Sequence, residues 1–177
     1  MPELGRVDIE TLKLHVYPEP QLQANGRPIL GGKDRPRVGL FISNKSAQRR
    51  WSWDKWRQLA LKLNAQAELL IFHDPAEQPS EQQLAGLTAR CLSTPSTDDL
   101  MAAMSQLDLV ISADSAPVHI GSALQIPVVA LFESRPEKYL RWYPLGVRHV
   151  LVHAGPQVED IHVDAVESAA RSLLTTD

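Results

Sequence analysis

The sequence predicts a doubly wound α/β fold, in which helices cover both faces of a parallel β-sheet. Short runs such as Val38-Gly-Leu-Phe-Ile42 and Leu109-Val-Ile-Ser112 are apolar at consecutive positions rather than at alternate ones. Strands of this kind are buried on both faces. Segments with helical periodicity separate the runs, as in βαβ units with right-handed crossovers. Ligands of such sheets bind beyond the carboxyl ends of the strands.

The helices are indicated by apolar spacing and by the residues at their first turn. Apolar residues recur at i, i+3, i+4 and i+7 from Trp56, and Ser52 stands at the expected N-cap. Thr97 and Ser115 are expected to begin two further helices in the same way. The expected strands are 38–42, 69–72, 91–92, 109–112, 127–132 and 149–152, and the expected helices are 53–63, 81–89, 97–106, 115–124, 137–140 and 163–174.

The length of 177 residues suits one well-buried domain. We place this domain at 36–177 and treat 1–35 as a lead-in or interdomain linker, because prolines, Asn25-Gly26 and Gly31-Gly32 interrupt every long periodic segment there. Within this lead-in only 12–17 alternates, as an edge strand would.

Composition excludes several classes of function. The net charge of −3 gives no reason to expect nucleic acid as a partner. Cys91 is the only cysteine, so an internal disulfide and a cysteine-pair metal site are both excluded. The N-terminus lacks a signal pattern, and no apolar run is long enough to span a bilayer. We therefore expect a cytoplasmic protein.

The segment Ala113-Asp-Ser-Ala-Pro-Val-His119 is a candidate phosphate site. It joins the end of a strand to the start of a helix, where unpaired N–H groups and the helix dipole attract anions. Asp114, Ser115 and Ala116 would line that site, and His119 lies on the same helix face as Ser115. The structural alternative is that Asp114 and Ser115 only cap the helix and that His119 is a buried, satisfied side chain.

A cationic loop follows the first strand. Lys45, Arg49 and Arg50 lie there among small polar residues, and arginine guanidinium groups match the oxygens of a diphosphate. In the structural alternative these cations form a solvated loop that Trp51 anchors to the core.

Two further loops carry weaker signals. After the second strand, Glu77 or His73 could contact a ribose or sugar hydroxyl, although a loop carboxylate is more often solvated. Aromatic residues in 132–144 could form the wall of a base or sugar pocket, or pack the last crossover. The sequence has no glycine-rich dinucleotide or Walker motif and no zinc-spaced histidine pair, so we expect neither a cofactor nor a metal ion.

Taken in order, these segments resemble the C-terminal domain of glycosyltransferase family 9, the ADP-heptose:lipopolysaccharide heptosyltransferases. The resemblance covers roughly 36–174. Its strongest part is Asp114-Ser-Ala-Pro-Val-His119 with the strand ending Pro127-Val-Val-Ala-Leu-Phe132, similar to the family's Asp-Thr-Gly-x-x-His segment and the strand after it. Arg49-Arg50-Trp51 resembles the family's Lys-Arg-Trp-Pro element, and Trp142-Tyr-Pro144 its late Trp-x-Pro segment.

The resemblance implies a Rossmann-like domain, the donor half of a two-domain GT-B enzyme that transfers heptose with inversion and without a metal ion. By this likeness Asp114, Ser115 and Ala116 would line the diphosphate-sugar site, Arg49 would balance phosphate charge and Glu77 would meet the ribose. Because the acceptor site and the proposed catalytic base belong to the family's N-terminal domain, we expect that domain to be missing or to come from a partner chain. We assign no catalytic residue here and expect the isolated chain to show little or no transfer.

Three departures from the family pattern leave other functions open. The family lysine is Arg49 here, its Thr-Gly is Ser115-Ala116, and its proline is Ser52. A non-catalytic single-domain relative, acting as an interaction or nucleotide-binding module, is therefore the second hypothesis. A third is an unrelated doubly wound domain, flavodoxin-like or receiver-like, although a receiver needs acidic residues where this chain has cations.

Overall fold

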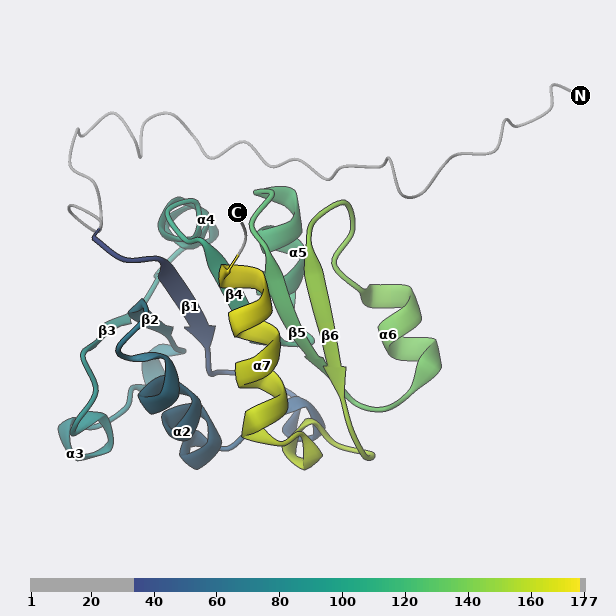
Figure 1. Ribbon diagram of the computed structural model, residues 1–177, viewed down its shortest axis with the longest axis horizontal. Coiled ribbons are helices and arrows are strands. Elements are labelled where there is room, and N and C mark those ends of the chain that lie inside the picture. The colour runs from purple at the N-terminus through teal and green to yellow at the C-terminus, as the bar shows by residue number, and fades with distance from the viewer. Residues whose placement is uncertain (1–33, 176–177) are drawn as a thin grey trace, which may run out of the picture.

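The computed structural model describes residues 34–175. The lead-in expected at 1–35 and the edge strand expected at 12–17 lie almost entirely outside these residues. Within them, six parallel strands form one sheet in the order β3-β2-β1-β4-β5-β6 (Figure 1). The strands are β1 (Arg37–Phe41), β2 (Glu68–Phe72), β3 (Ala89–Leu92), β4 (Leu109–Ala113), β5 (Val128–Phe132) and β6 (His149–His153).

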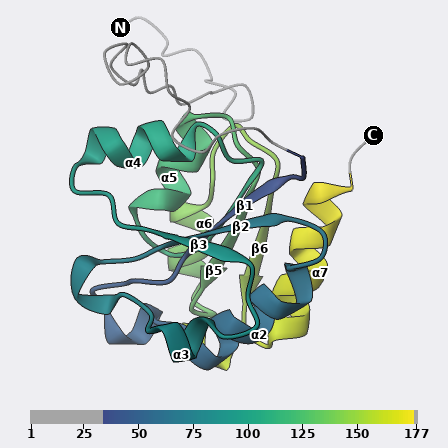
Figure 2. The ribbon, with the colours of Figure 1, turned by 90° about the vertical axis from the view of Figure 1, so that its left-hand side faces the viewer.

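Helices cover both faces of the sheet, as Figure 2 shows from the side. The residues of α2 and α7 pack with Val38, Leu40 and every second residue of the neighbouring strands. Those of α4 and α5 pack with Phe41, Leu70 and the other strand positions. The prediction of a parallel sheet buried on both faces is confirmed. The helices are α2 (Trp53–Leu63), α3 (Glu81–Leu84), α4 (Thr97–Met104), α5 (Ala116–Ala123), α6 (Pro136–Trp142) and α7 (Val163–Leu174).

Two helix predictions are wrong. The helix expected over 81–89 ends at Leu84, because Gly86 has a φ of +82° and turns the chain out of the helix. The residues that follow form β3, which starts at Ala89, two residues earlier than expected. Thr97 is not a cap: the N-cap of α4 is Ser96, whose hydroxyl accepts a hydrogen bond from the Asp99 amide.

The strand order separates this sheet from the flavodoxin-like alternative. From the centre, the chain proceeds through β1, β2 and β3 to one edge and through β4, β5 and β6 to the other. This order is that of dinucleotide-binding sheets, whereas flavodoxin-like sheets begin 2-1-3. The direction of winding reverses between β1 and β4, which are neighbours. A crevice is therefore expected beyond the carboxyl ends of these two strands.

No helix within residues 34–175 has the length and apolar character needed to cross a bilayer. The described residues also form three short 3-10 helices: η2 (Ala47–Arg49), η3 (Pro75–Glu77) and η4 (Val158–Asp160). The first two lie in the loops that follow β1 and β2. These loops, and the loop after β4, end at the same edge of the sheet.

Candidate functional site

A cavity of about 650 Å³ opens where the winding of the sheet reverses. A pocket of this size is within the range that small ligands occupy. Its walls come from the loops after β1, β2 and β4, together with residues near the start of α4. The lining residues are Phe41, Ser43, Asn44, Lys45, Arg49, Arg50, Phe72, His73, Asp74, Pro75, Ala76, Glu77, Thr94, Leu100, Asp114, Ser115, Ala116 and Pro117.

Asn44 fixes the loop after β1 against the end of β4. Its side chain is buried, and its Nδ2 donates to the carbonyl of Asp114 at 3.1 Å. Its Oδ1 accepts from the amide of Ser46 at 3.0 Å, which shapes the loop before η2. The first of these bonds joins two walls of the cavity, and the second orders the loop that forms one of them. Sequence reasoning missed Asn44, since a single asparagine in a polar loop gives no signal by itself.

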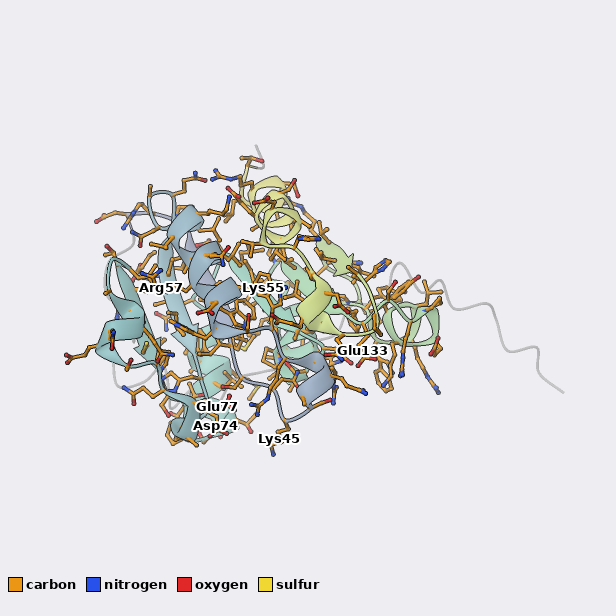
Figure 3. The ribbon with its side chains drawn as sticks, turned by 90° about the horizontal axis from the view of Figure 1, so that it is seen from below. Lys45, Lys55, Arg57, Asp74, Glu77 and Glu133 are labelled. Carbon is orange, nitrogen blue, oxygen red and sulfur yellow. The ribbon has the colours of Figure 1, made fainter. Side chains whose placement is uncertain are left out.

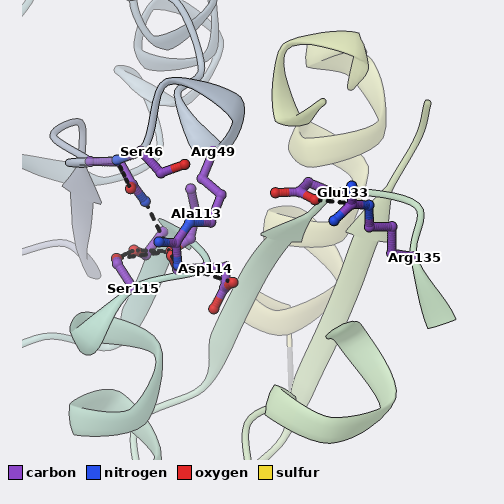
Figure 4. Close-up of polar contacts among 9 residues, drawn as sticks. Ser46, Arg49, Ala113, Asp114, Ser115, Glu133 and Arg135 are labelled. Carbon is purple, nitrogen blue, oxygen red and sulfur yellow. Dashed lines mark hydrogen bonds and ion pairs between the residues drawn. The ribbon is translucent and has the colours of Figure 1, made fainter. Parts of the chain in front are cut away.

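Arg49 lies directly beside the start of α5. Its Nη1 donates to the carbonyl oxygen of Asp114 at 3.1 Å and lies 3.3 Å from Oδ2 of the same residue (Figure 4). The Arg49 side chain is 34% exposed and that of Asp114 12%. The arginine is therefore held in place by the helix-start segment while part of its guanidinium still faces the cavity.

Arg50 and Glu77 form an ion pair across the mouth of the cavity, with 2.7 Å between Nη2 and Oε1. Arg50 Nε also donates to the carbonyl of Asn44 at 2.7 Å. Both side chains are partly exposed, so the pair is worth little to stability. Lys45 has no carboxylate partner within the described residues (Figure 3). It is thus the most readily available cation for an anionic ligand.

Ser115 occupies the N-cap position of α5, but its side chain does not cap the helix. The hydroxyl instead donates to the carbonyl of Ala113 at 2.9 Å. The first amide groups of a helix have no acceptor within the helix. Pro117 supplies no amide hydrogen, which leaves Ser115 and Ala116 as the backbone donors nearest to the cavity.

His119 is not brought to this cavity. It lies one turn further along α5, its ring centroid is 6.2 Å from that of Trp142 in α6, and it does not line the cavity. The other six residues expected at the site, Arg49, Arg50, Glu77, Asp114, Ser115 and Ala116, all line it.

The floor of the cavity on the β2 side is apolar. Phe41 and Phe72 are stacked there with centroids 4.4 Å apart, and Leu100 adds an aliphatic wall. His73, which was a candidate, is buried, and its Nδ1 lies 2.9 Å from the carbonyl of Asp74. The site therefore has a polar part between Arg49 and Ser115 and, near the end of β2, an apolar floor where Asp74 and Glu77 also line the cavity. Such a division suits a ligand with an anionic part and a flat organic part.

In the described part of the chain, no three histidine, cysteine, aspartate or glutamate side chains gather into a cluster that could hold a metal ion.

The alternative role for Trp51 is observed: it is buried, and its Nε1 donates to the carbonyl of Ile161 at 3.0 Å. This bond anchors the loop after β1 to the segment after η4. Lys45 and Arg50 of the same loop are exposed, so the loop is both anchored by Trp51 and largely solvated, as the structural alternative expects.

A parallel sheet of this strand order, with a cavity at its reversal point, defines the class of doubly wound ligand-binding α/β domains. The sequence profile of glycosyltransferase family 9 (heptosyltransferase) matches residues 13–168. The chain belongs to this family. Comparison with curated protein sequences gives no match.

Solved structures of the same family have this fold. A family 9 glycosyltransferase from Veillonella parvula aligns with a TM-score of 0.75 at 18% identity, over 97% of this chain and 56% of that one. The E. coli ADP-heptose lipopolysaccharide heptosyltransferase II aligns with a TM-score of 0.69 at 19% identity, over 92% and 53%. The E. coli heptosyltransferase WaaC, solved with ADP-2-deoxy-2-fluoro heptose, aligns with a TM-score of 0.65 at 16% identity, over 81% of this chain and 46% of that one. The chain spans about half the length of these proteins.

Proposed function

We propose that the chain binds a nucleotide sugar of the ADP-heptose type, as the donor half of an inverting, metal-independent glycosyltransferase of lipopolysaccharide core synthesis. The observation that carries this proposal is the cavity between the cationic loop after β1 and the start of α5. Both walls present hydrogen-bond donors suited to phosphate oxygens. The likeness to WaaC, which was solved with an ADP-sugar, supports the choice of donor.

In this proposal the donor diphosphate lies between Arg49 and the amides of Ser115 and Ala116. Lys45 adds a further cation at the open side. The nucleoside extends over the Phe41–Phe72 stack. Glu77 reaches the ribose only if it exchanges its partner Arg50 for a ribose hydroxyl. Because that ion pair is partly exposed, the exchange costs little.

The chemical role of these groups is to stabilise the departing nucleoside diphosphate. Donors already held in position toward developing charge lower the barrier without reorganising during the reaction. The acceptor hydroxyl also needs a base within hydrogen-bond reach. We assign that base and the acceptor site to a second domain or partner chain, acting on a lipid-linked acceptor at the cytoplasmic side of the inner membrane.

A second function is favoured by a specific observation. The two cavity arginines are already paired, Arg49 with Asp114 and Arg50 with Glu77. A site whose charges satisfy one another is also what a non-catalytic relative would retain after losing its ligand. In that case the chain acts as an interaction module on the same fold.

Calorimetric titration of the 177-residue chain with ADP and with ADP-heptose separates the two functions. For a donor domain we expect saturable binding, weakened roughly 10- to 100-fold in Arg49→Ala because charge-assisted hydrogen bonds to phosphate are lost. Arg49→Lys keeps the charge but not the planar guanidinium, so its affinity should lie between those of the parent and Arg49→Ala. Absence of binding at millimolar ligand would favour the module.

Arg57→Ala is the matched control. Arg57 lies on α2, where it donates to the carbonyls of Gln83 and Ala85 rather than to the cavity (Figure 3). The Arg57→Ala variant should bind ADP and ADP-heptose with the same affinities as the parent. A transfer assay with the isolated chain should give no product, and measurable heptose transfer would contradict the assignment of the base to another domain.

A further inference from the structure

Lys45 is the one cation of the cavity that no carboxylate of the described residues neutralises. Of the other cationic side chains that line the cavity, Arg49 is paired with Asp114 and Arg50 with Glu77. Lys45 is exposed, and it forms no ion pair within the part of the chain that the structure describes. Its charge is therefore available to a ligand without the loss of an existing contact.

The charges that line the cavity cancel one another. The last carboxylate there, that of Asp74, caps η3: its Oδ1 accepts a hydrogen bond from the amide of Ala76 at 3.0 Å. With His73 neutral, the lining holds three cations and three carboxylates, namely Lys45, Arg49 and Arg50, and Asp74, Glu77 and Asp114. A diphosphate brings additional negative charge into this balanced set. The groups left to meet that charge are the unpaired ammonium of Lys45 and the amides at the start of α5.

Neighbouring contacts place Lys45 at the open side of the phosphate position. The preceding residue, Asn44, donates to the carbonyl of Asp114, so the main chain at Lys45 lies close to the segment that begins α5. Figure 3, a view from the carboxyl-end side of the sheet, shows Lys45 beside Asp74 and Glu77. A nucleoside that lies over the apolar floor near β2 directs its terminal phosphate away from that floor, toward Lys45 and α5.

The terminal phosphate differs in charge between a nucleotide sugar and the free nucleoside diphosphate. In the nucleotide sugar this phosphate is esterified to the sugar and carries a single negative charge. During transfer, the bond between the anomeric carbon and the phosphate oxygen breaks, and the electron pair remains on that oxygen. The acceptor oxygen bonds to the anomeric carbon and loses its proton to the base. The terminal phosphate then becomes a dianion above its second pKa, which is about 6 for a phosphate monoester.

We infer that Lys45 recognises the charge on this terminal phosphate and so selects the free nucleoside diphosphate over the sugar-linked donor. This inference rests on the proposed function. Arg49 and Arg50 are neutralised by their own carboxylates, whereas a cation without a partner gains most from an added negative charge. The same preference acts on the departing diphosphate, because a group that binds the developing charge more strongly than the bound donor lowers the barrier. The released diphosphate should consequently compete with the donor for the site.

The test is calorimetric titration of the full chain with ADP and with ADP-heptose at about pH 8 and low salt, for the parent and for Lys45→Ala. The two ligands differ by one charge on the terminal phosphate, and one charge pair a few ångströms apart in an exposed position changes affinity about fivefold. Lys45→Ala should therefore lose about fivefold more affinity for ADP than for ADP-heptose. Lys45→Arg keeps the charge and should keep the ratio of the two affinities. Lys138→Ala makes the same substitution on α6, outside the cavity lining, and should change neither affinity.

Salt and thermal unfolding separate the recognition of charge from a structural role. Because Lys45 is exposed, the difference between the parent and Lys45→Ala should shrink at about 1 M salt, where the screening length is about 3 Å. The melting temperature without ligand should be the same for both proteins. Equal losses of affinity for ADP and ADP-heptose, or a difference that salt leaves unchanged, would overturn the inference while leaving the donor site intact. If the parent binds neither ligand, the proposed function itself fails and the inference with it.

Discussion

Replacing Asn44 by alanine should loosen the candidate site and lower stability by an amount that follows from two hydrogen bonds. The buried side chain donates to the Asp114 carbonyl and accepts from the Ser46 amide. The variant loses both bonds. Arg49 still donates to the Asp114 carbonyl, whereas the amide of half-buried Ser46 loses its side-chain acceptor.

Each hydrogen bond contributes about 1 kcal/mol net, so the expected loss is about 2 kcal/mol. For a domain of this size, each kcal/mol corresponds to roughly 2–4 °C, which gives a melting temperature lower by roughly 4–8 °C. Circular dichroism during heating measures this melting temperature. Asn64→Ala is the control, because Asn64 accepts a single exposed bond from the Thr88 amide. That surface variant should change stability by less than about 0.5 kcal/mol. If both variants melted at the same temperature, Asn44 would not connect the two walls as described.

Three other predictions concern the scaffold. In Gly39→Ala the new Cβ would lie 2.6 Å from Cδ1 of Leu107, so stability should fall by about 1–3 kcal/mol. Leu107→Ala removes this closest contact, so in urea unfolding the double variant should lose less stability than the sum of the two single variants; full additivity would contradict the clash. Burial raises the pKa of the Cys91 thiol, so Ellman's reagent at pH 7.5 should react with it more slowly than with a free cysteine peptide until urea is added. Hydrogen bonds from Lys62 and Arg171 lower the pKa of Glu167 below its ordinary 4.5. The stabilising effect of ionised Glu167 is therefore fully present above pH 4.5 and is lost as the pH falls through the lower pKa of the folded state. The parent and Glu167→Gln should consequently have the same melting temperature in acid. A difference in melting temperature that persists there would refute the pairing.

The sequence by itself determined the fold class and the order of its elements. Consecutive apolar residues in β1, β4 and β5 required a sheet buried on both faces, and the helical segments between them supplied the covering layers. The position of the site followed from the same pattern, because loops after parallel strands all end at one edge. Where local signals were weak, as at Gly86, the sequence-based boundary was wrong by several residues.

Only the tertiary structure decided which side chains meet. Arg49 and Asp114 are 65 positions apart in the chain and come together because β1 and β4 are neighbours in the strand order, which no local periodicity specifies. Arg50 meets Glu77 through the adjacent loops after β1 and β2. His119 shares a helix with Ser115 but lies against α6, since one further turn along α5 carries it past the cavity. Asn44 gave no signal as one residue in a polar loop. Its burial and its hydrogen bond to the Asp114 carbonyl are properties of packing, which depends on contacts between distant parts of the chain.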